Sequence, residues 1–391
     1  MITRRIASID LLRGIVMVIM AIDHTRDFIN TAAFAFRPED LTQTTTAIFL
    51  TRWITHICAP TFMLCAGLGA GLRLQRGGTV PELSRFLWTR GLWLVLLEFT
   101  LVRLGFFFSL TTGPLSLIVF WALGMSMVVL ALLVRLPFRV LLGVSVGMIA
   151  LHNLTDPVPA AAFGSFVWLW QILHQQSLIN AGIVLVVVAY PLVPWIGVMG
   201  VGFCLARVYG WPDDERRRFL IGLGLALTAA FVVVRGLNVY GDPQPWAVQP
   251  RAGFTWISFL NCTKYPPSLS FLLMTLGPAI TILGLLDRAA PGERNPFLVF
   301  GRVPLLYFVL HIPLIHAVEI GLAWLRYGPA PFIALPPPSL GTPRTAFPAD
   351  FGWRLWVVYA VTAGVVLALY PVCLWFSRLK ARRRAWWLGY L

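Results

Sequence analysis

The sequence predicts an all-α, polytopic integral membrane protein with about ten transmembrane helices and a cytoplasmic N-terminus. Hydrophobic residues make up 58% of the 391 residues and charged residues only 12%, against roughly 25% charged residues in soluble domains. The mean hydropathy is +0.78, and several apolar runs reach the length of about 20 residues that crosses a bilayer. The 16 tryptophans are typical of rings at membrane interfaces.

Basic residues between the apolar runs set the predicted topology. They fall on one side of the membrane only if the number of passes is even, which places both termini in the cytoplasm. Segment 163–190 is ambiguous: an eleventh pass there would put the basic C-terminus outside, so we prefer a lumenal or re-entrant segment. We find no internal repeat and no soluble domain, and we expect a single domain over residues 1–391. In order, the ten predicted passes cover 8–28, 50–73, 86–110, 114–135, 138–155, 184–208, 217–238, 265–286, 297–323 and 353–378.

The composition also excludes several classes of partner. The formal net charge is +15, but the arginines are spread among short inter-helix loops, as membrane topology requires, so we expect no nucleic acid partner. The five cysteines show neither paired nor metal-ligand spacing, which predicts no disulfide and no metal. The acidic end of the first run, Asp23 to Asp27, and the lack of a small-residue cleavage site argue against a signal peptide.

The first pass carries ionisable residues at both ends, Asp10 and Arg13 at its start and Asp23, His24 and Asp27 at its end. Such groups are costly inside a bilayer and by default mark a site or a pathway. His24 and Asp27 are three residues apart and share a helix face. A carboxylate there could orient the imidazole and raise its basicity, and these are the least that a general base requires. The alternative is an interfacial histidine that hydrogen-bonds lipid headgroups or a backbone carbonyl.

Other polar residues converge on the same predicted outer end. His56 begins the second pass, and His311 lies midway along the ninth, with His316 a turn and a half further out. A buried neutral histidine bonded to another helix is the alternative for His311. We predict two groups of residues at this end. The catalytic candidates are Asp23, His24, Asp27, His56 and His311, and the substrate-binding candidates are Asn261, Lys264 and Tyr265.

Cationic residues occupy the predicted cytoplasmic end. Arg13, Arg85 and Arg90 are candidates to clamp a phosphate, because guanidinium groups bind phosphate oxygens in pairs. The alternative for Arg85 and Arg90 is topology anchoring. Glu98 and Arg103 lie within the bilayer in the third pass, where we expect a structural salt bridge between helices.

Five segments carry a resemblance to a known family. The chain resembles the catalytic domain of the heparan-alpha-glucosaminide N-acetyltransferase family, in its bacterial branch, which was long filed as a domain of unknown function. It is more distantly similar to the integral-membrane acyltransferases that O-acylate surface polysaccharides, whose functional histidine falls on His24. The resemblance covers nearly the whole chain. The segments that carry it are Ser-Ile-Asp-Leu-Leu-Arg-Gly at 8–14, the runs at 58–67 and 190–199, Leu-Asn-Cys-Thr-Lys-Tyr-Pro-Pro-Ser-Leu at 260–269, and the run at 300–311.

The resemblance implies acyl transfer across the inner membrane of a cell. Acetyl-CoA or another acyl-CoA would bind from the cytoplasm with its nucleotide near Arg13, Arg85 and Arg90, and a glycan or small-molecule acceptor would bind outside. Membrane lipids are expected partners, and a homodimer is an alternative to a monomer. The catalytic histidine of the animal enzyme falls on about Thr44 to Thr46, where this chain has none. Either His24 takes the base role or the chemistry differs.

A transporter or flippase for a small molecule or lipid-linked substrate is the competing prediction. Glu98, Arg103 and His311 would suit a proton or substrate pathway through the membrane. Repeat-built transporters usually show paired broken helices in two halves, and we find no such pair in this sequence. Stabilisation by CoA or acetyl-CoA would separate the two functions, because a transporter has no reason to respond.

Overall fold

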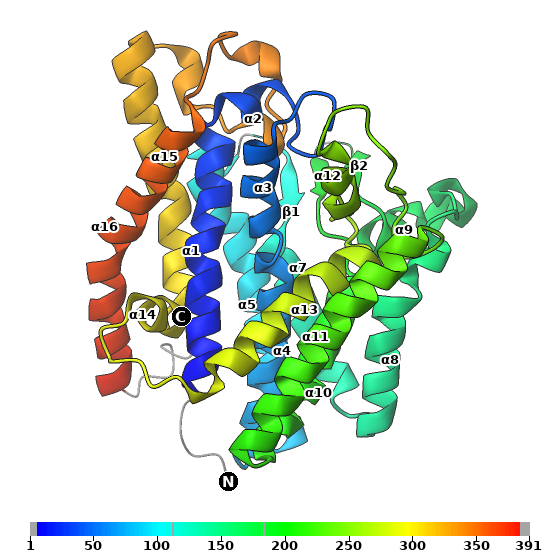
Figure 1. The fold of residues 1–391 in the computed structure, drawn as a ribbon. Helices are drawn as coiled ribbons and strands as arrows, with labels where there is room; N and C mark the ends of the chain where they lie inside the picture. Colours follow the sequence, from blue (N-terminus) through cyan, green and yellow to red (C-terminus); the bar gives the residue numbers. More distant parts are fainter. Residues whose placement is uncertain (1–5, 112, 181, 183, 384–391) are drawn as a thin grey trace.

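Helices dominate the chain, as predicted, in a computed structural model that describes residues 6–111, 113–180, 182 and 184–383. Figure 1 shows long helices packed side by side, with the start of α1 at one end of the bundle, which we call the N-terminal end. The α-helices are α1 (Ala7–Ile29), α2 (Thr31–Ala35), α3 (Thr46–Thr55), α4 (Cys58–Gln75), α5 (Val80–Leu97), α6 (Arg103–Phe107), α7 (Val119–Leu133), α8 (Phe138–Ala150), α9 (Val167–His174), α10 (Val193–Leu205), α11 (Asp213–Leu237), α12 (Phe254–Leu260), α13 (Leu269–Leu285), α14 (Pro296–Arg302), α15 (Pro304–Tyr327) and α16 (Leu355–Arg382).

Short helical segments of other types connect these elements. A π-helix, η1, lies between α5 and α6, and the remaining η segments are 3-10 turns. Their bounds are η1 (Glu98–Val102), η2 (His152–Thr155), η3 (Ala160–Phe166), η4 (Ala206–Gly210), η5 (Leu286–Arg288), η6 (Pro331–Ala334), η7 (Pro338–Leu340) and η8 (Arg344–Ala346).

Six helical runs of the described chain are long and apolar enough to cross a membrane. Each of the ten predicted passes contains a helix. Helices α7 and α8 are shorter than a bilayer requires, so the total of ten membrane crossings remains a prediction. The ambiguous segment 163–190 holds the eight-residue α9 and two strands in its described part, too short for an eleventh pass. The six runs are Thr46–Gln75, Val193–Gly210, Asp213–Leu237, Leu269–Arg288, Pro304–Tyr327 and Leu355–Arg382.

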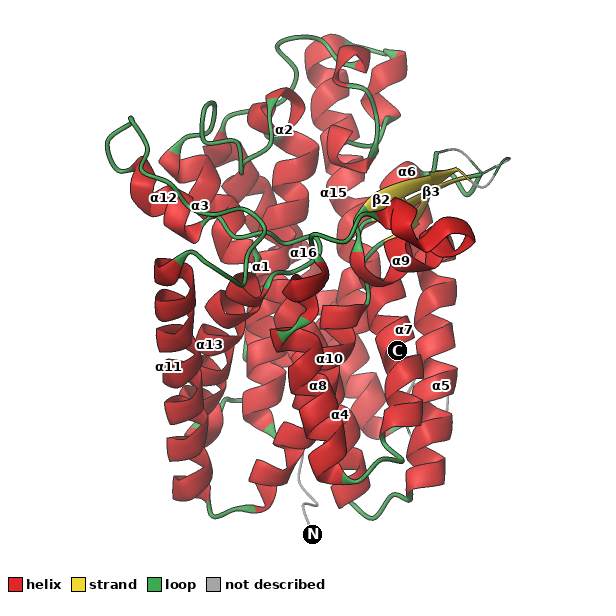
Figure 2. Ribbon diagram, turned by 90° about the vertical axis from the view of Figure 1, so that its right-hand side faces the viewer, coloured by secondary structure: helices red, strands yellow, loops and turns green. Residues whose placement is uncertain are grey.

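A small sheet departs from the all-α prediction. Its strands are β1 (Leu115–Leu117), β2 (Ser177–Asn180) and β3 (Leu185–Val188), in the order β1-β3-β2. β1 pairs with β3 in parallel and β2 pairs with β3 antiparallel. Figure 2 shows this sheet beside α9, away from the N-terminal end. β1 and β3 lie within the predicted passes 114–135 and 184–208, because short apolar strands and helix ends look alike in sequence.

Close backbone contacts hold α1 against α14. A Cβ atom on Gly14 would lie 1.7 Å from the carbonyl oxygen of Phe297, and one on Gly301 would lie 1.7 Å from that of Asp10. Only glycine fits at such distances, and small residues are what allow membrane helices to pack this closely. The predicted ninth pass is broken at Val303 into α14 and α15, and Pro304 begins the second helix. The contact fixes the N-terminal half of α1.

The long connections gather at the other end of the bundle, which we call the loop end. It comprises the end of α1 at Ile29, then α2, α12 and the turns η6 to η8 (Figures 1 and 2). A bridge between Asn30 and Trp353 joins the end of α1 to the start of α16. An aromatic cluster of Phe34, Phe347 and Phe351 packs beneath these turns. The charged end of α1 therefore lies just below a structured cap.

Candidate functional site

Two histidines from different helices meet below the loop end. The rings of His24 on α1 and His311 on α15 lie 5.1 Å apart between centroids. Phe106 of α6 and Phe308 of α15 pack edge-on to His24, at 5.6 and 6.3 Å. His311 is fully buried and His24 is half-buried. The structure thus brings together two predicted site residues that are 287 positions apart in the sequence.

The His311 ring has a defined tautomer. Its Nδ1 lies 2.6 Å from the carbonyl oxygen of Phe308 and 3.2 Å from that of Tyr307. A carbonyl only accepts, so Nδ1 carries the hydrogen and Nε2 keeps a lone pair. No described residue offers a hydrogen-bond partner to that Nε2. Leaving a buried acceptor unpaired costs about 1–3 kcal/mol, so this lone pair is available to a proton or to a reacting group.

An arginine network lies beside the histidines and comprises Asp23, Arg26, Asp27, Glu39 and Arg52. Asp23 pairs with Arg52 and, at 3.1 Å, with Arg26. Arg26 also donates to Asp27 at 2.6 Å, and Arg52 donates to Glu39 at 3.1 Å. Burial opposes ionisation of Glu39, but the Arg52 guanidinium overcomes it and holds the pKa of that carboxyl below its usual value.

This network overturns the expected link between His24 and Asp27. The Asp27 carboxylate bonds to Arg26, and the His24 ring packs against aromatic rings. A guanidinium forms stronger, charge-assisted hydrogen bonds with a carboxylate than a neutral imidazole does. Sequence spacing identified the shared face of His24 and Asp27 but not the competing arginines, since Arg52 comes from α3.

His56 and Lys264 lie at the same level on neighbouring elements. His56 is 1% exposed, its ring lies 5.2 Å from that of Phe271, and neither ring nitrogen has a hydrogen-bond partner among the described residues. The Lys264 amine sits 5.1 Å from the ring centroid of Tyr265. Tyr265 donates a long 3.4 Å hydrogen bond to Tyr190.

Asn261 makes structural contacts, and so do Thr44 and Thr45, which lie in the segment that corresponds to the catalytic histidine of the animal enzyme. The Asn261 side chain donates to the Glu39 carbonyl at 3.0 Å, tying the end of α12 to the segment before α3. Thr44 is buried, and its carbonyl accepts from Arg251 at 2.8 Å. The Thr45 hydroxyl caps α3 by accepting from the Ile48 amide. These contacts anchor the cap of the molecule above the histidines.

The predicted phosphate-clamp arginines lie towards the N-terminal end of the bundle. Arg13 donates to the Cys65 carbonyl at 2.7 Å and lies 3.8 Å from Asp10. Arg90 and Arg73 flank the ring of Phe86, at 6.0 and 4.2 Å. Arg85 is exposed. Arg73 and Arg85 are thus exposed and Arg90 is half-buried, whereas Arg13 is already engaged by α4.

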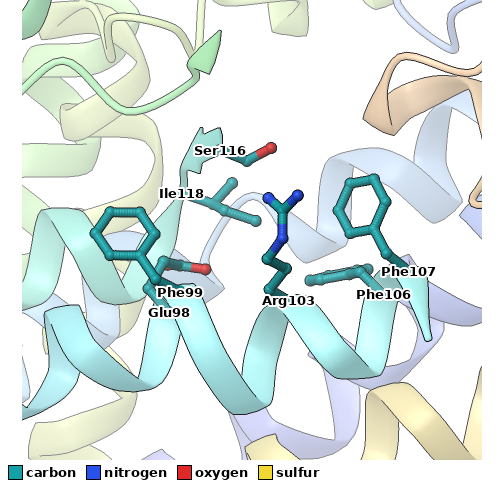
Figure 3. A pocket seen from close by; sticks show the side chains of 7 residues that line it. All are labelled: Glu98, Phe99, Arg103, Phe106, Phe107, Ser116 and Ile118. Atoms are coloured by element: carbon teal, nitrogen blue, oxygen red, sulfur yellow. The ribbon is translucent and has the colours of Figure 1, made fainter. Parts of the chain in front are cut away.

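We expected Glu98 and Arg103 to form salt bridges with other helices, but the structure holds both residues through backbone groups. Glu98 accepts from the backbone amides of Phe120 and Trp121, at 2.7 and 3.0 Å, where it caps the start of α7. Arg103 donates to three loop carbonyls, those of Leu110, Gly113 and Pro114. Unsatisfied amides at a helix N-terminus attract a carboxylate. Both side chains line a cavity of about 10 Å³ next to Phe106 (Figure 3), roughly the space of one water molecule.

The described residues contain no group of three or more histidine, cysteine or acidic side chains placed to hold a metal ion. All five cysteines are free and buried. Sequence reasoning missed Arg26, Arg52 and Glu319 as members of this region. The signal for Glu319 was available, because it is a carboxyl within an apolar pass of α15.

Comparison with protein families agrees with the resemblance in the motifs. Residues 5–240 match the family model described as heparan-alpha-glucosaminide N-acetyltransferase, catalytic. The match covers more than half of the 391 residues and includes His24, Arg26, His56 and Arg85, whereas His311 lies beyond it. A search of curated proteins finds no significant match. The chain therefore belongs to the heparan-alpha-glucosaminide N-acetyltransferase catalytic family.

Proposed function

We propose that this protein is a membrane acetyltransferase that moves an acyl group from cytoplasmic acyl-CoA to a sugar or glycan acceptor at the outer face. The family supports membrane acetyl transfer. The donor, the acceptor and the sidedness are our inference from the positions of the charged groups. The loop end would face outwards and the N-terminal end would face the cytoplasm, following the distribution of basic residues.

The pair of His24 and His311 is the observation that carries the proposal. Their rings are 5.1 Å apart, one half-buried and the other fully buried with a free Nε2 lone pair. A base needs a fixed tautomer and an unused lone pair within reach of the acceptor proton. His24 would take the proton from the acceptor nitrogen or oxygen, and His311 would orient it and share the charge.

The proposed reaction breaks the thioester C–S bond and forms a C–N or C–O bond to the acceptor. The base removes the acceptor proton as the nucleophile attacks, and the departing thiolate takes up a proton to leave as CoA thiol. The ion pairs of the arginine network would hold the side chains around the reacting groups in a fixed arrangement. Lys264, next to Tyr265, would add a positive charge close to the acceptor.

The donor would enter from the opposite end of the bundle. Arg85 is exposed and Arg90 lies over Phe86, so both can meet the phosphates of a nucleotide. Arg13, which the sequence placed in the same group, is bonded to the Cys65 carbonyl. We therefore assign it to positioning α4 against α1 on the donor side.

The test combines a binding measurement with a transfer measurement on the purified full-length protein. Acetyl-CoA at 100 times its Kd should stabilise the fold by about 2.7 kcal/mol and raise the melting temperature. Mass spectrometry should then detect N-acetylglucosamine when glucosamine is supplied. A transporter would give neither result, so a flat melting curve together with no product would reject the proposal.

Sidedness needs its own test, because transfer across the membrane depends on it. Single cysteines placed at Val248, which is exposed at the loop end, and at Arg85 should be labelled from opposite sides of intact cells. Labelling of both from one side would place donor and acceptor on the same face, and transfer across the membrane would then be abandoned.

A further inference from the structure

Helix α16 lies on the outside of the bundle and runs from the loop end to the N-terminal end (Figure 1). Residues 355–377 of this helix contain no acidic residue, lysine, arginine or histidine. Exposed side chains recur along it every three or four positions, as on one face of a helix. This outer face of α16 includes Trp356, Tyr359, Ala363, Leu367, Pro371 and Trp375. An uncharged face of this length is suited to contact with lipid acyl chains.

Two tryptophans delimit the outer face. Trp356 and Trp375 are 67% and 62% exposed. Their positions differ by 19 residues, which is about 28 Å along the helix axis. The hydrocarbon core of a bilayer is about 30 Å thick, and tryptophan rings prefer its two boundaries. We therefore place Trp356 at the boundary on the loop-end side and Trp375 at the opposite one.

An exposed arginine lies just beyond each tryptophan. Arg354 precedes Trp356 by two residues, and Arg378 follows Trp375 by three. The two arginines are about 36 Å apart along α16, so both fall at the level of the lipid headgroups of a bilayer about 40–45 Å thick in total. The Arg354 guanidinium forms no hydrogen bond or ion pair with a described residue.

Arg354 lines a cleft of about 370 Å³ at the loop end, together with Arg326, Asp350, Trp353 and Trp356. Arg326 pairs with Asp350 at 2.8 Å, so these two charges compensate each other. The charge of Arg354 is therefore the net charge of the cleft. The first turn of α16 has no acidic residue and no side-chain cap, and its backbone amides add partial positive charge. The cleft is thus suited to a group with a single negative charge.

Backbone contacts build one wall of this cleft. Gly352 has a positive φ of 96°, and a Cβ atom on it would lie 2.7 Å from the amide nitrogen of Thr31. The Trp353 amide donates to the Ile29 carbonyl at 2.7 Å, and its own carbonyl accepts from Thr31 at 3.1 Å. Arg326 donates to the Gly352 carbonyl at 2.9 Å. The wall is therefore formed before any ligand arrives, which lowers the entropic cost of binding.

We propose that this cleft binds the phosphate of an anionic phospholipid from the leaflet at the loop end. Arg354 would hold the phosphate oxygens with the paired donors of its guanidinium, and Trp356 would lie below it at the boundary of the hydrocarbon core. The acyl chains would run along the outer face of α16. A phosphodiester with no ammonium group of its own matches the single net charge of the cleft. This lipid would be a partner of the fold and would take no part in the proposed acyl transfer.

A lipid fits this cleft better than a soluble phosphate does. The cleft lies at the level where headgroups are found, and it continues into a face that has no charged residue for about 28 Å. A soluble phosphate would use only the guanidinium, whereas a phospholipid would also cover exposed apolar surface.

Native mass spectrometry of the full-length protein in detergent tests the proposal. The protein is titrated with phosphatidylglycerol, which is anionic, and with phosphatidylcholine, which has no net charge. We expect R354Q to weaken the binding of phosphatidylglycerol about 10-fold, the effect of losing one charge-assisted hydrogen bond. R378Q is the matched control, because Arg378 is an exposed arginine of the same helix at the other headgroup level. It should change the affinity less than about 2-fold, as isolated surface charges contribute little.

Three outcomes would each overturn the proposal. Equal losses in R354Q and R378Q would mean a general attraction of surface charges. Equal affinity of the wild type for the two lipids would mean that the cleft does not select an anionic headgroup, and this comparison needs no variant. Displacement of phosphatidylglycerol by excess glycerol 3-phosphate would mean a site for soluble phosphate. In detergent without added lipid, R354Q should melt like the wild type, because the Arg354 guanidinium is not bonded to any described residue.

Discussion

The histidine pair and the arginine network lie side by side in the bundle, yet ion pairs hold the network together, whereas neither histidine of the pair forms an ion pair with a described residue. In the network, Asp23, Arg26 and Arg52 share close ion pairs. In the pair, His311 leaves a ring nitrogen unused. Buried charges must be paired to be tolerated, whereas a catalytic base must keep a lone pair free. The proposed function rests on this contrast between side chains that hold the fold and side chains that would react.

Removing the His24 imidazole should lower activity strongly and leave the stability of the fold unchanged. We expect His24→Ala to lower acetyl transfer by about 10²–10⁴-fold, the usual loss when one proton-transfer group is removed. The melting temperature and its increase with acetyl-CoA should stay near wild type, because His24 makes no hydrogen bond to the network. Product formation is measured by mass spectrometry at saturating donor. Near-wild-type turnover would show that His24 is not the base.

The opposite substitution breaks the network. Arg52→Met leaves the carboxylates of Asp23 and Glu39 without a close partner from α3, and loss of one partner of a buried pair costs about 3–5 kcal/mol. We expect a large fall in melting temperature, recovered in part by Asp23→Asn in the same chain because it removes the uncompensated charge. Arg354→Met, at an exposed arginine, is the control. Equal melting of R52M and wild type would mean that the network is not structural.

The donor end should respond in affinity rather than in turnover. Arg85→Gln and Arg90→Gln each remove a charge-assisted hydrogen bond, worth about 1.5–3 kcal/mol, so the Kd for CoA should rise about 10-fold or more per arginine. The value of kcat at saturating donor should change little. Titration calorimetry with CoA gives the Kd, and Arg76→Gln on the loop after α4 serves as a comparison. If the Kd is unchanged, Arg85 and Arg90 do not bind the nucleotide and serve only to anchor the membrane topology.

A pH effect on stability is the smallest change that we expect. Arg52 lowers the pKa of Glu39. The contribution of Glu39 to the free energy of unfolding is therefore fully present above the ordinary pKa of a glutamate. It is lost as the pH falls through the lowered value, where the folded state takes up the proton. The effect is modest because the side chain is 36% exposed. Melting curves in acid should show a shallower decline for Glu39→Gln, and identical curves would remove Glu39 from the network.

The sequence by itself determined the membrane class, the helical segments and the family. Apolar runs of bilayer length need no tertiary information, because the bilayer requires backbone hydrogen bonds to be satisfied within each helix. The charged ends of the first pass and the histidine at 311 likewise indicated, before any fold was known, the side chains that make up the candidate site. Glycines such as Gly14 could be seen in the sequence, but their partners could not.

Only the tertiary structure decided which charges pair. Spacing along a helix limits the neighbours of a side chain on its own helix, so His24 and Asp27 could be placed on one face. It says nothing about Arg52 on α3 or His311 on α15, which reach the end of α1 through packing. Glu98 and Arg103 show the same limit, since backbone amides and loop carbonyls hold them. Pairing across helices depends on three-dimensional contacts, and the order of residues along the chain does not contain those contacts.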